Sequence, residues 1–106
     1  MPDRPKRVAA IHDLSGFGRC SLSVILPVMS RFGIQVCPVP TAVLSTHTGG
    51  FTDFTFVDLT DSMRDTLNHY QSLHIQFDSI YSGFLGSLEQ IDIVKDYIDS
   101  YRKNAK

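Results

Sequence analysis

Three short strand-like segments alternate along this chain with stretches in which apolar residues recur every three or four positions. Two of the segments are apolar runs, at residues 7–11 and 34–39, and the third covers residues 77–82. Short runs of this kind are typical of buried strands, and the three-to-four spacing is typical of helices packed on one face. The order strand, helix, strand, helix, strand, helix predicts an α/β fold. We therefore expect a parallel βαβαβα unit with right-handed crossovers.

The expected helices have recognisable start and stop signals. Gly33 predicts the end of the first helix, and Thr60 is expected to cap the second. Ser87 followed by Gln90 has the spacing of a capping box ahead of the third. The predicted buried faces are formed by Leu22, Ile25, Met29 and Phe32, by Met63, Leu67, Tyr70 and either Leu73 or His74, and by Ile91, Val94, Ile98 and Tyr101.

Three prolines fall inside the predicted elements. Pro27 is expected to kink the first helix or to lie in its first turns, because proline lacks a backbone donor. Pro38 and Pro40 are expected to end the second strand early. A polar loop is predicted over residues 44–51.

Length and charge exclude several classes of protein. With 106 residues, the chain is expected to form one domain, 1–106. Its net charge of −1 argues against a nucleic-acid partner, because phosphate-binding domains usually carry a basic excess. No apolar run approaches the roughly 18 residues of a membrane span, and none has the form of a signal-peptide core. We therefore expect a cytoplasmic protein with no membrane partner, in which Cys20 and Cys37 are buried thiols.

Unusual polar or glycine-rich sequence follows each predicted strand, at residues 12–19, 45–50 and 82–86. Ligands of parallel sheets bind beyond the carboxyl ends of the strands. The convergence of three such segments therefore predicts a ligand site at this edge of the sheet.

Several familiar sites are excluded by single residues. Gly16 and Gly18 follow a strand as in a dinucleotide fingerprint, but Ser21 replaces the third glycine, so a tight turn is the expected role of these glycines. Ser15 does not lie in a nucleophile elbow, because Asp13 precedes it where glycine would be required. A phosphate-binding Gly-Lys-Ser/Thr sequence is absent.

Histidines near the predicted strand ends have two readings each. His12, Asp13 and His47 could meet as metal ligands, but three such residues often coincide by chance, and no metal site is predicted. The alternative for His12 is a local hydrogen bond at the end of a strand. His47 lies between threonines and before two glycines, which suits a small polar ligand or a hydroxyl-rich turn.

Three segments together resemble one family. Residues 10–19 read Ala-Ile-His-Asp-Leu-Ser-Gly-Phe-Gly-Arg, residues 41–49 read Thr-Ala-Val-Leu-Ser-Thr-His-Thr-Gly, and residues 82–90 read Ser-Gly-Phe-Leu-Gly-Ser-Leu-Glu-Gln. Their order and spacing resemble the N-terminal portion of pyridoxal/pyridoxamine kinases of the ribokinase-like superfamily. The resemblance implies an incomplete kinase domain that carries the acceptor-substrate side of a three-layer α/β/α fold.

The resemblance also implies a set of substrate-binding residues. Asp13 would contact the pyridine ring, Thr48 would contact the substrate beside His47, and Phe84 would stack on the ring. The family more often has serine, asparagine and tyrosine where this chain has Asp13, Thr46 and Phe84. These departures leave hydroxymethylpyrimidine kinase open as an alternative. The implied substrate-binding set is Asp13, Ser15, Ser45, His47, Thr48 and Phe84.

ATP and Mg²⁺ are the cofactors that the resemblance implies, together with a homodimeric full-length protein. Members of the superfamily place a Gly-x-Gly-Asp segment, which supplies the catalytic base, in their later half. The only Gly-x-Gly of this chain is followed by Arg19. No catalytic residue is therefore expected in these 106 residues, and the isolated chain is expected to be inactive. A non-catalytic ligand-binding module is the other reading. An unrelated flavodoxin-like or receiver domain is disfavoured, because a receiver needs an acidic cluster where only Asp13 stands.

Overall fold

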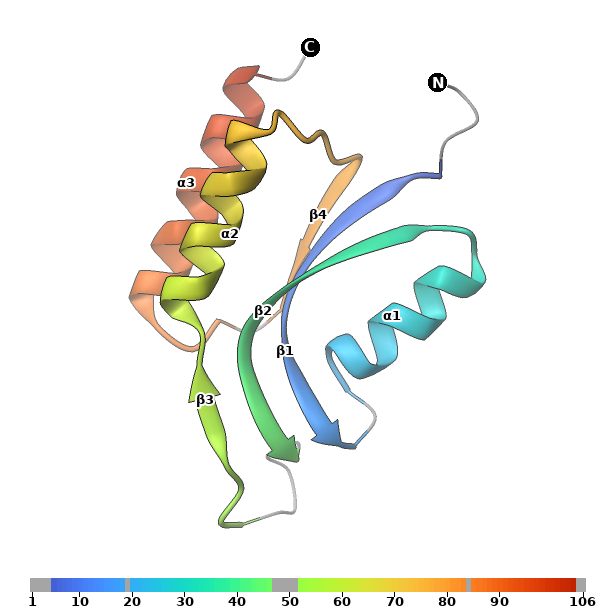
Figure 1. Cartoon of the computed structure of the whole chain (residues 1–106), viewed down its shortest axis with the longest axis vertical. Coiled ribbons are helices and arrows are strands. Elements are labelled where there is room, and N and C mark those ends of the chain that lie inside the picture. Colours follow the sequence, from blue (N-terminus) through green and yellow to red (C-terminus); the bar gives the residue numbers. More distant parts are fainter. Residues whose placement is uncertain (1–4, 19, 47–51, 84, 105–106) are drawn as a thin grey trace.

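A computed structural model describes residues 5–18, 20–46, 52–83 and 85–104, with side chains described as far as residue 100. Figure 1 shows α1 on one side of a twisted sheet and the pair α2 and α3 on the other. The three-layer arrangement that the family resemblance implies is therefore present. The elements are β1 (Arg7–Phe17), α1 (Leu22–Arg31), β2 (Gln35–Thr46), β3 (Phe56–Asp58), α2 (Thr60–Ser72), β4 (Ser79–Ser82) and α3 (Leu88–Asn104).

The sheet has the strand order β3-β2-β1-β4. β1 is parallel to both β2 and β4, which confirms the predicted parallel unit. β3 is antiparallel to β2 and was not expected. Its three residues are all exposed, so they carry no alternation of buried and exposed positions from which a strand could be predicted.

β1 and β2 are longer than predicted. They were expected to end at residues 11 and 39 but continue to Phe17 and Thr46, paired with each other beyond the end of β4. Pro38 and Pro40 therefore do not end β2, and the expected polar loop at 44–46 is strand. β3 pairs with β2 only at residues 42–44, so both prolines lie on a free edge, where a missing N–H group breaks no ladder.

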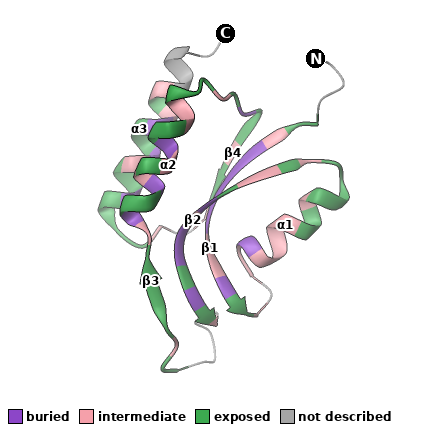
Figure 2. Ribbon diagram, in the orientation of Figure 1, coloured by how far each residue is buried: buried purple, intermediate pink, exposed green. Residues whose placement is uncertain are grey.

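The main core lies between the sheet and the helix pair α2 and α3 (Figure 2). Ala9 and Ile11 of β1 alternate with Val8, Ala10 and His12, so successive side chains serve opposite faces of the sheet. The buried core residues are Ala9, Ile11, Val39, Met63, Leu67, Phe77, Val94 and Tyr97.

The predicted helix faces are only partly correct. Met63, Leu67 and Val94 are buried as expected, but Leu73 and His74 are exposed. Ile91 is 37% exposed, and Gln90 and Tyr97 complete the buried face of α3 in its place. The side chain of Tyr101 lies outside the described set. In α1 only Leu22 is buried, and Phe32 lies outside the helix at 76% exposure.

The helix termini follow the sequence signals with one correction. Gly33 has a φ of 77° just after α1, as a stop signal requires, and Pro27 lies inside the helix. Thr60 is the first residue of α2 rather than its cap, because the Asp58 carboxylate accepts hydrogen bonds from the Thr60 backbone (3.2 Å) and hydroxyl (2.9 Å). None of the helices in the described ranges is both long enough and apolar enough to cross a membrane.

Candidate acceptor-substrate site

A carboxylate held by hydroxyl groups lies where β1 passes the end of β4. Asp13 is half-buried and follows the last residues of β1 that pair with β4. Ser21 Oγ donates to Asp13 Oδ1 at 2.8 Å, and Ser15 Oγ donates to Oδ2 at 3.3 Å. Ser23 Oγ donates to the Ser15 carbonyl at 2.7 Å, which ties α1 to β1. The cluster therefore joins the strand to the start of the following helix.

Ser21 has an unusual backbone conformation. Its φ and ψ are 51° and −132°, a region that residues other than glycine adopt at a cost of roughly 1–3 kcal/mol. It stands at the N-cap position of α1, yet its side chain makes no capping hydrogen bond and is used for Asp13 instead. The strain is thus located at the predicted substrate site.

The polar groups of Ser45 form hydrogen bonds with Thr55, just before β3. Its Oγ accepts the backbone N–H of Thr55 at 2.9 Å, and its own N–H donates to the Thr55 carbonyl at 3.1 Å. Gly16 lies in β1 and not in a tight turn as expected. A Cβ at Gly16 would stand 3.2 Å from the Ser45 carbonyl oxygen. The glycine therefore permits close approach of β1 and β2.

Of the predicted substrate set, the structure brings two residues together, since Ser15 and Asp13 are hydrogen-bonded. Ser45 does not join them: Ser15 is paired with Leu44, so the next side chain, Ser45, lies on the opposite face of the sheet and bonds to Thr55. Thr46, the last residue of β2, has a buried Oγ1 atom with no hydrogen-bond partner. The expectations for His47, Thr48 and Phe84 fall outside the described residues.

His12 is buried beside the end of β4 and does not end β1 as expected. Its ring lies edge-on to Tyr81 with a centroid distance of 4.5 Å, and its Nε2 atom is buried without a partner. A Cβ at Gly83 would stand 2.3 Å from His12 Nδ1. Within the described ranges, no three His, Cys, Asp or Glu residues cluster as metal ligands.

The buried His12 ring should make stability depend on pH. Burial lowers the pKa of His12 below 6.5, although the Asp13 carboxylate and a backbone hydrogen bond at Tyr81 oppose this shift. The His12 ring therefore binds a proton more readily in the unfolded chain than in the folded one. The contribution of the neutral ring to the free energy of unfolding is fully present above pH 6.5 and is lost as the pH falls towards the lower pKa of the folded state. Urea unfolding at pH 7.5 and 5.5 should show this loss, and His12→Gln should reduce it. His69→Gln, on the exposed face of α2, should leave the pH dependence unchanged, and an equal reduction there would contradict the assignment.

A shift of register in β2 turns one backbone carbonyl towards the helices. Between His12 and Leu14 the pairing of β1 with β2 moves by one residue, and Thr41 lies in the shifted segment. Its carbonyl accepts hydrogen bonds from the Leu59 N–H at 3.0 Å and from the Gln90 side chain. The irregularity therefore links the sheet to the start of α2 and α3.

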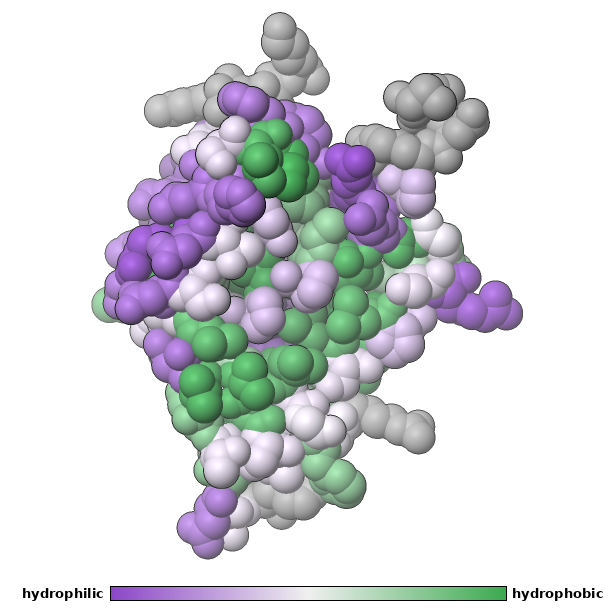
Figure 3. Space-filling view, viewed as in Figure 1, coloured by the Kyte–Doolittle hydropathy of each residue, from purple (hydrophilic) through white to green (hydrophobic). Residues whose placement is uncertain are grey.

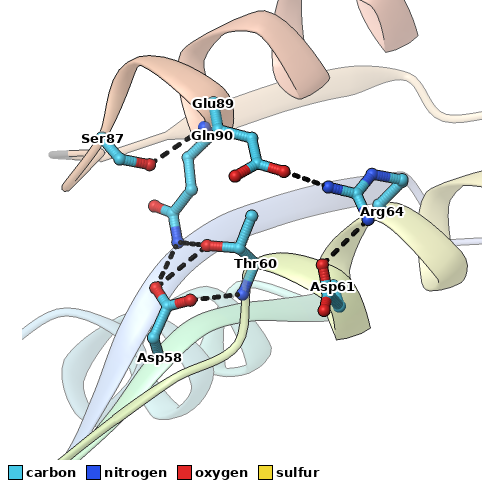
Figure 4. Close-up of polar contacts among 7 residues, drawn as sticks. All are labelled: Asp58, Thr60, Asp61, Arg64, Ser87, Glu89 and Gln90. Atoms are coloured by element: carbon cyan, nitrogen blue, oxygen red, sulfur yellow. Dashed lines mark hydrogen bonds and ion pairs between the residues drawn. The ribbon is translucent and has the colours of Figure 1, made fainter.

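Gln90 is the residue that joins these segments, and the sequence analysis assigned it only to a capping box. It is 3% exposed, and its Nε2 donates to the Thr41 carbonyl at 3.1 Å. Figure 4 shows the bonds from the same Nε2 to Asp58 Oδ1 (3.3 Å) and Thr60 Oγ1 (3.1 Å). Its Oε1 accepts the Gly86 N–H at 3.2 Å. Gln90 thus anchors the segment after β4. The sequence feature that could have identified Gln90 as buried is its position, one turn before Val94 on the buried face of α3.

One half of the predicted capping box is present, since Ser87 Oγ accepts the Gln90 N–H at 3.2 Å. The Gln90 side chain bonds to the Gly86 N–H. On the outer side of the same region, Arg64 forms ion pairs with Asp61 at 2.9 Å and with Glu89 (Figure 4).

A cavity of about 280 Å³ lies between α2 and α3, away from Asp13. It is lined by Arg64, Leu67, Asn68, Gln71, Ile93, Asp96, Tyr97 and Ser100.

Comparison with known proteins relates this arrangement to one class. No protein-family model and no curated protein matches the chain. Among solved structures, a Bacteroides thetaiotaomicron protein assigned as a phosphomethylpyrimidine kinase is 50% identical, with a TM-score of 0.91 over 98% of this chain and 36% of that one. The same protein was also crystallised with pyridoxal, at 52% identity over 94% of this chain.

Two pyridoxal kinases extend the comparison. The enzyme from Lactobacillus plantarum is 30% identical, with a TM-score of 0.85 over 90% of this chain and 34% of that one. The enzyme from Leishmania donovani, solved with ADP and pyridoxamine, is 13% identical with a TM-score of 0.84, which shows a shared fold. The chain spans about a third of the length of each of these structures.

The fold is that of the N-terminal part of a ribokinase-like kinase. Within this class the chain is similar to pyridoxal kinases and to phosphomethylpyrimidine kinase, which confirms the resemblance inferred from its three sequence segments.

Proposed function

We propose that the protein phosphorylates the 5′-hydroxymethyl group of pyridoxal, pyridoxamine or pyridoxine with ATP, in vitamin B6 salvage. The observation that carries the proposal is the match, over 94% of this chain at 52% identity, to a protein crystallised with pyridoxal. In this reaction the hydroxymethyl oxygen bonds to the γ-phosphorus while the bond to the leaving ADP breaks, and the hydroxyl proton passes to a base. The chain's own contribution is to bind and orient the ring.

The proposed division of labour follows from the residues present. Asp13, Thr48 and Phe84 would hold the ring, and ATP and Mg²⁺ would be bound mainly by segments that these 106 residues do not contain. Within the described ranges, no three His, Cys, Asp or Glu residues lie together, so these residues do not by themselves fit a Mg²⁺ site. Residues 1–106 would then be one incomplete kinase domain, inactive in isolation.

A second substrate has its own support. The 50% identical Bacteroides protein is assigned as a phosphomethylpyrimidine kinase, so hydroxymethylpyrimidine or its phosphate is the alternative acceptor. Both acceptors present a hydroxymethyl group on a nitrogen-containing aromatic ring. They differ in the ring atoms that Asp13 would meet.

The proposal is tested by measuring ADP formation with each acceptor, using the protein as its gene encodes it. Pyridoxal should support turnover, and Asp13→Asn should raise KM for pyridoxal about tenfold or more while KM for ATP changes less than about twofold, because a charge-assisted hydrogen bond is lost on one side only. Asp92→Asn, on the exposed face of α3, is the matched control.

Three other results would each contradict the proposal. Turnover confined to the pyrimidine would favour the alternative substrate. Binding of pyridoxal without turnover would favour a non-catalytic module. Equal losses for pyridoxal and ATP in Asp13→Asn would remove Asp13 from the acceptor side.

We also propose that the full-length protein is cytoplasmic and a homodimer. Figure 3 shows apolar side chains gathered beside β3, where Val43 and Val57 are paired and 40% and 55% exposed. An exposed edge strand with apolar residues is a surface that proteins usually cover. Sedimentation velocity should give a dimer for the wild-type protein and a monomer for Val57→Lys. A wild-type monomer at micromolar concentration would contradict the dimer.

A further inference from the structure

The conformation of Ser21 is one that glycine would adopt without strain. Its φ of 51° and ψ of −132° lie in a region that L-residues rarely occupy. No capping bond explains the serine, because its Oγ does not bond to the helix backbone. What the serine supplies instead is the 2.8 Å hydrogen bond to Asp13 Oδ1. Strained backbone that persists in this way often marks a functional site.

The Asp13 carboxylate is held at both oxygens. Ser21 Oγ donates to Oδ1, and the nearly fully buried Ser15 donates to Oδ2 at 3.3 Å. An ionised carboxylate only accepts hydrogen bonds, and each oxygen can accept more than one. The carboxylate therefore keeps acceptor capacity in a restricted orientation. A group that complements it must present an N–H or O–H donor.

We propose that Ser21 is a positioning residue, which orients the Asp13 carboxylate to accept a hydrogen bond from a protonated ring nitrogen of the substrate. This inference rests on the proposed function and deepens it. The pair Ser21 and Asp13 makes the site selective for aromatic rings that carry an N–H donor over rings of the same shape that lack it. The cost is backbone strain at Ser21, and the gain is a carboxylate with one orientation.

The test uses two ligands and two replacements of Ser21 in the protein as its gene encodes it. The ligands are pyridoxal and its 1-deaza analogue, in which CH replaces the ring nitrogen. Ser21→Gly removes both the hydroxyl and the strain, whereas Ser21→Ala removes the hydroxyl and keeps the strain. Calorimetry measures both affinities, and thermal unfolding measures stability.

The wild-type protein is expected to bind pyridoxal at least about tenfold more tightly than the deaza analogue, because a site built for a donor rejects a ligand without it. Ser21→Gly should lose most of this discrimination while its Tm stays equal to or above that of the wild type. Ser21→Ala should lose the same discrimination with a lower Tm. In a Ser21→Gly background, Asp13→Asn should cause little further loss of discrimination.

Ser23→Ala is the matched control. Ser23 also lies at the start of α1, but its hydroxyl donates to the Ser15 backbone carbonyl and not to Asp13. This variant should lower Tm and keep the discrimination. If Ser23→Ala loses as much discrimination as Ser21→Ala, Ser21 has only a structural role.

Three further outcomes separate this inference from the proposed function. If the wild type discriminates and Ser21→Gly discriminates equally, the positioning role is wrong and the proposed function stands. If the wild type binds both ligands equally, Asp13 does not recognise the ring nitrogen and the inference is overturned. If the wild type binds neither pyridoxal nor hydroxymethylpyrimidine, the proposed function itself fails.

Discussion

The free energy of unfolding of a Gly83→Ala variant is expected to be about 2–3 kcal/mol below that of the wild type, because the added methyl group overlaps a buried ring. An ideal Cβ at this position would stand 2.3 Å from His12 Nδ1 and 2.6 Å from Cε1. The His12 side chain is only 6% exposed and packs on Tyr81, so it has little room to move. Urea unfolding at pH 7.5 measures the loss. Since Gly83 directly follows β4, the proposed affinity for pyridoxal should also fall.

A glycine and a double variant test the cause of this loss. Gly86→Ala lies in the same segment, and a Cβ there would meet nothing within 4 Å, so its effect should be below about 0.5 kcal/mol. Combining Gly83→Ala with His12→Ala should restore part of the stability relative to the sum of the two single losses. Strictly additive losses would show that the His12 ring is not the obstacle.

Gln90→Leu is expected to lower the free energy of unfolding by roughly 3 kcal/mol. The variant has a side chain of similar size but lacks the amide that bonds to Thr41, Thr60 and Gly86. Each buried polar group left without a partner costs about 1–3 kcal/mol. The expected loss is not the sum of several such costs, because the Thr60 hydroxyl still bonds to Asp58 and the Thr41 carbonyl still accepts the Leu59 N–H. KM for pyridoxal should also rise, because Gly86 belongs to the segment that would carry the stacking residue Phe84.

The matched control is Gln76→Leu, because Gln76 is exposed between α2 and β4. Its effect on unfolding should stay within about 0.5 kcal/mol. Gln90→Glu offers a second comparison, since it keeps the shape and the acceptor but loses the donor to the Thr41 carbonyl. A Gln90→Leu protein as stable as the control would mean that the network of Figure 4 contributes little to the fold.

The local elements could be predicted because their signals are short-range. Gly33 ends α1, and Met63 and Leu67 form the buried face of α2, since helix periodicity and stop signals act within a few residues. The parallel order of β1, β2 and β4 followed from the alternation of strands and helices. The rule for the carboxyl ends of parallel strands assigned segment 12–19 to a ligand site, and the family resemblance then selected Asp13 and Ser15 within it.

Other features depend on residues distant in the chain. The prolines at positions 38 and 40 predicted an early end to β2, but β2 continues because its free edge there requires no N–H donor. Gln90 is a helix-cap residue by its neighbours, yet its amide bonds to residues 30 to 49 positions away. Nothing within a few residues of it encodes those partners.

The sequence by itself determined the class of fold and the end of α1 near Gly33, because these depend on local periodicity and on order along the chain. The candidate ring-binding residues rest on the resemblance of three segments to a known family. The tertiary structure alone decided how far β1 and β2 extend, which residue occupies the buried polar position on α3, and that Ser21 is strained to hold Asp13. Each of these is set by hydrogen bonds and packing between segments that only the folded chain brings together.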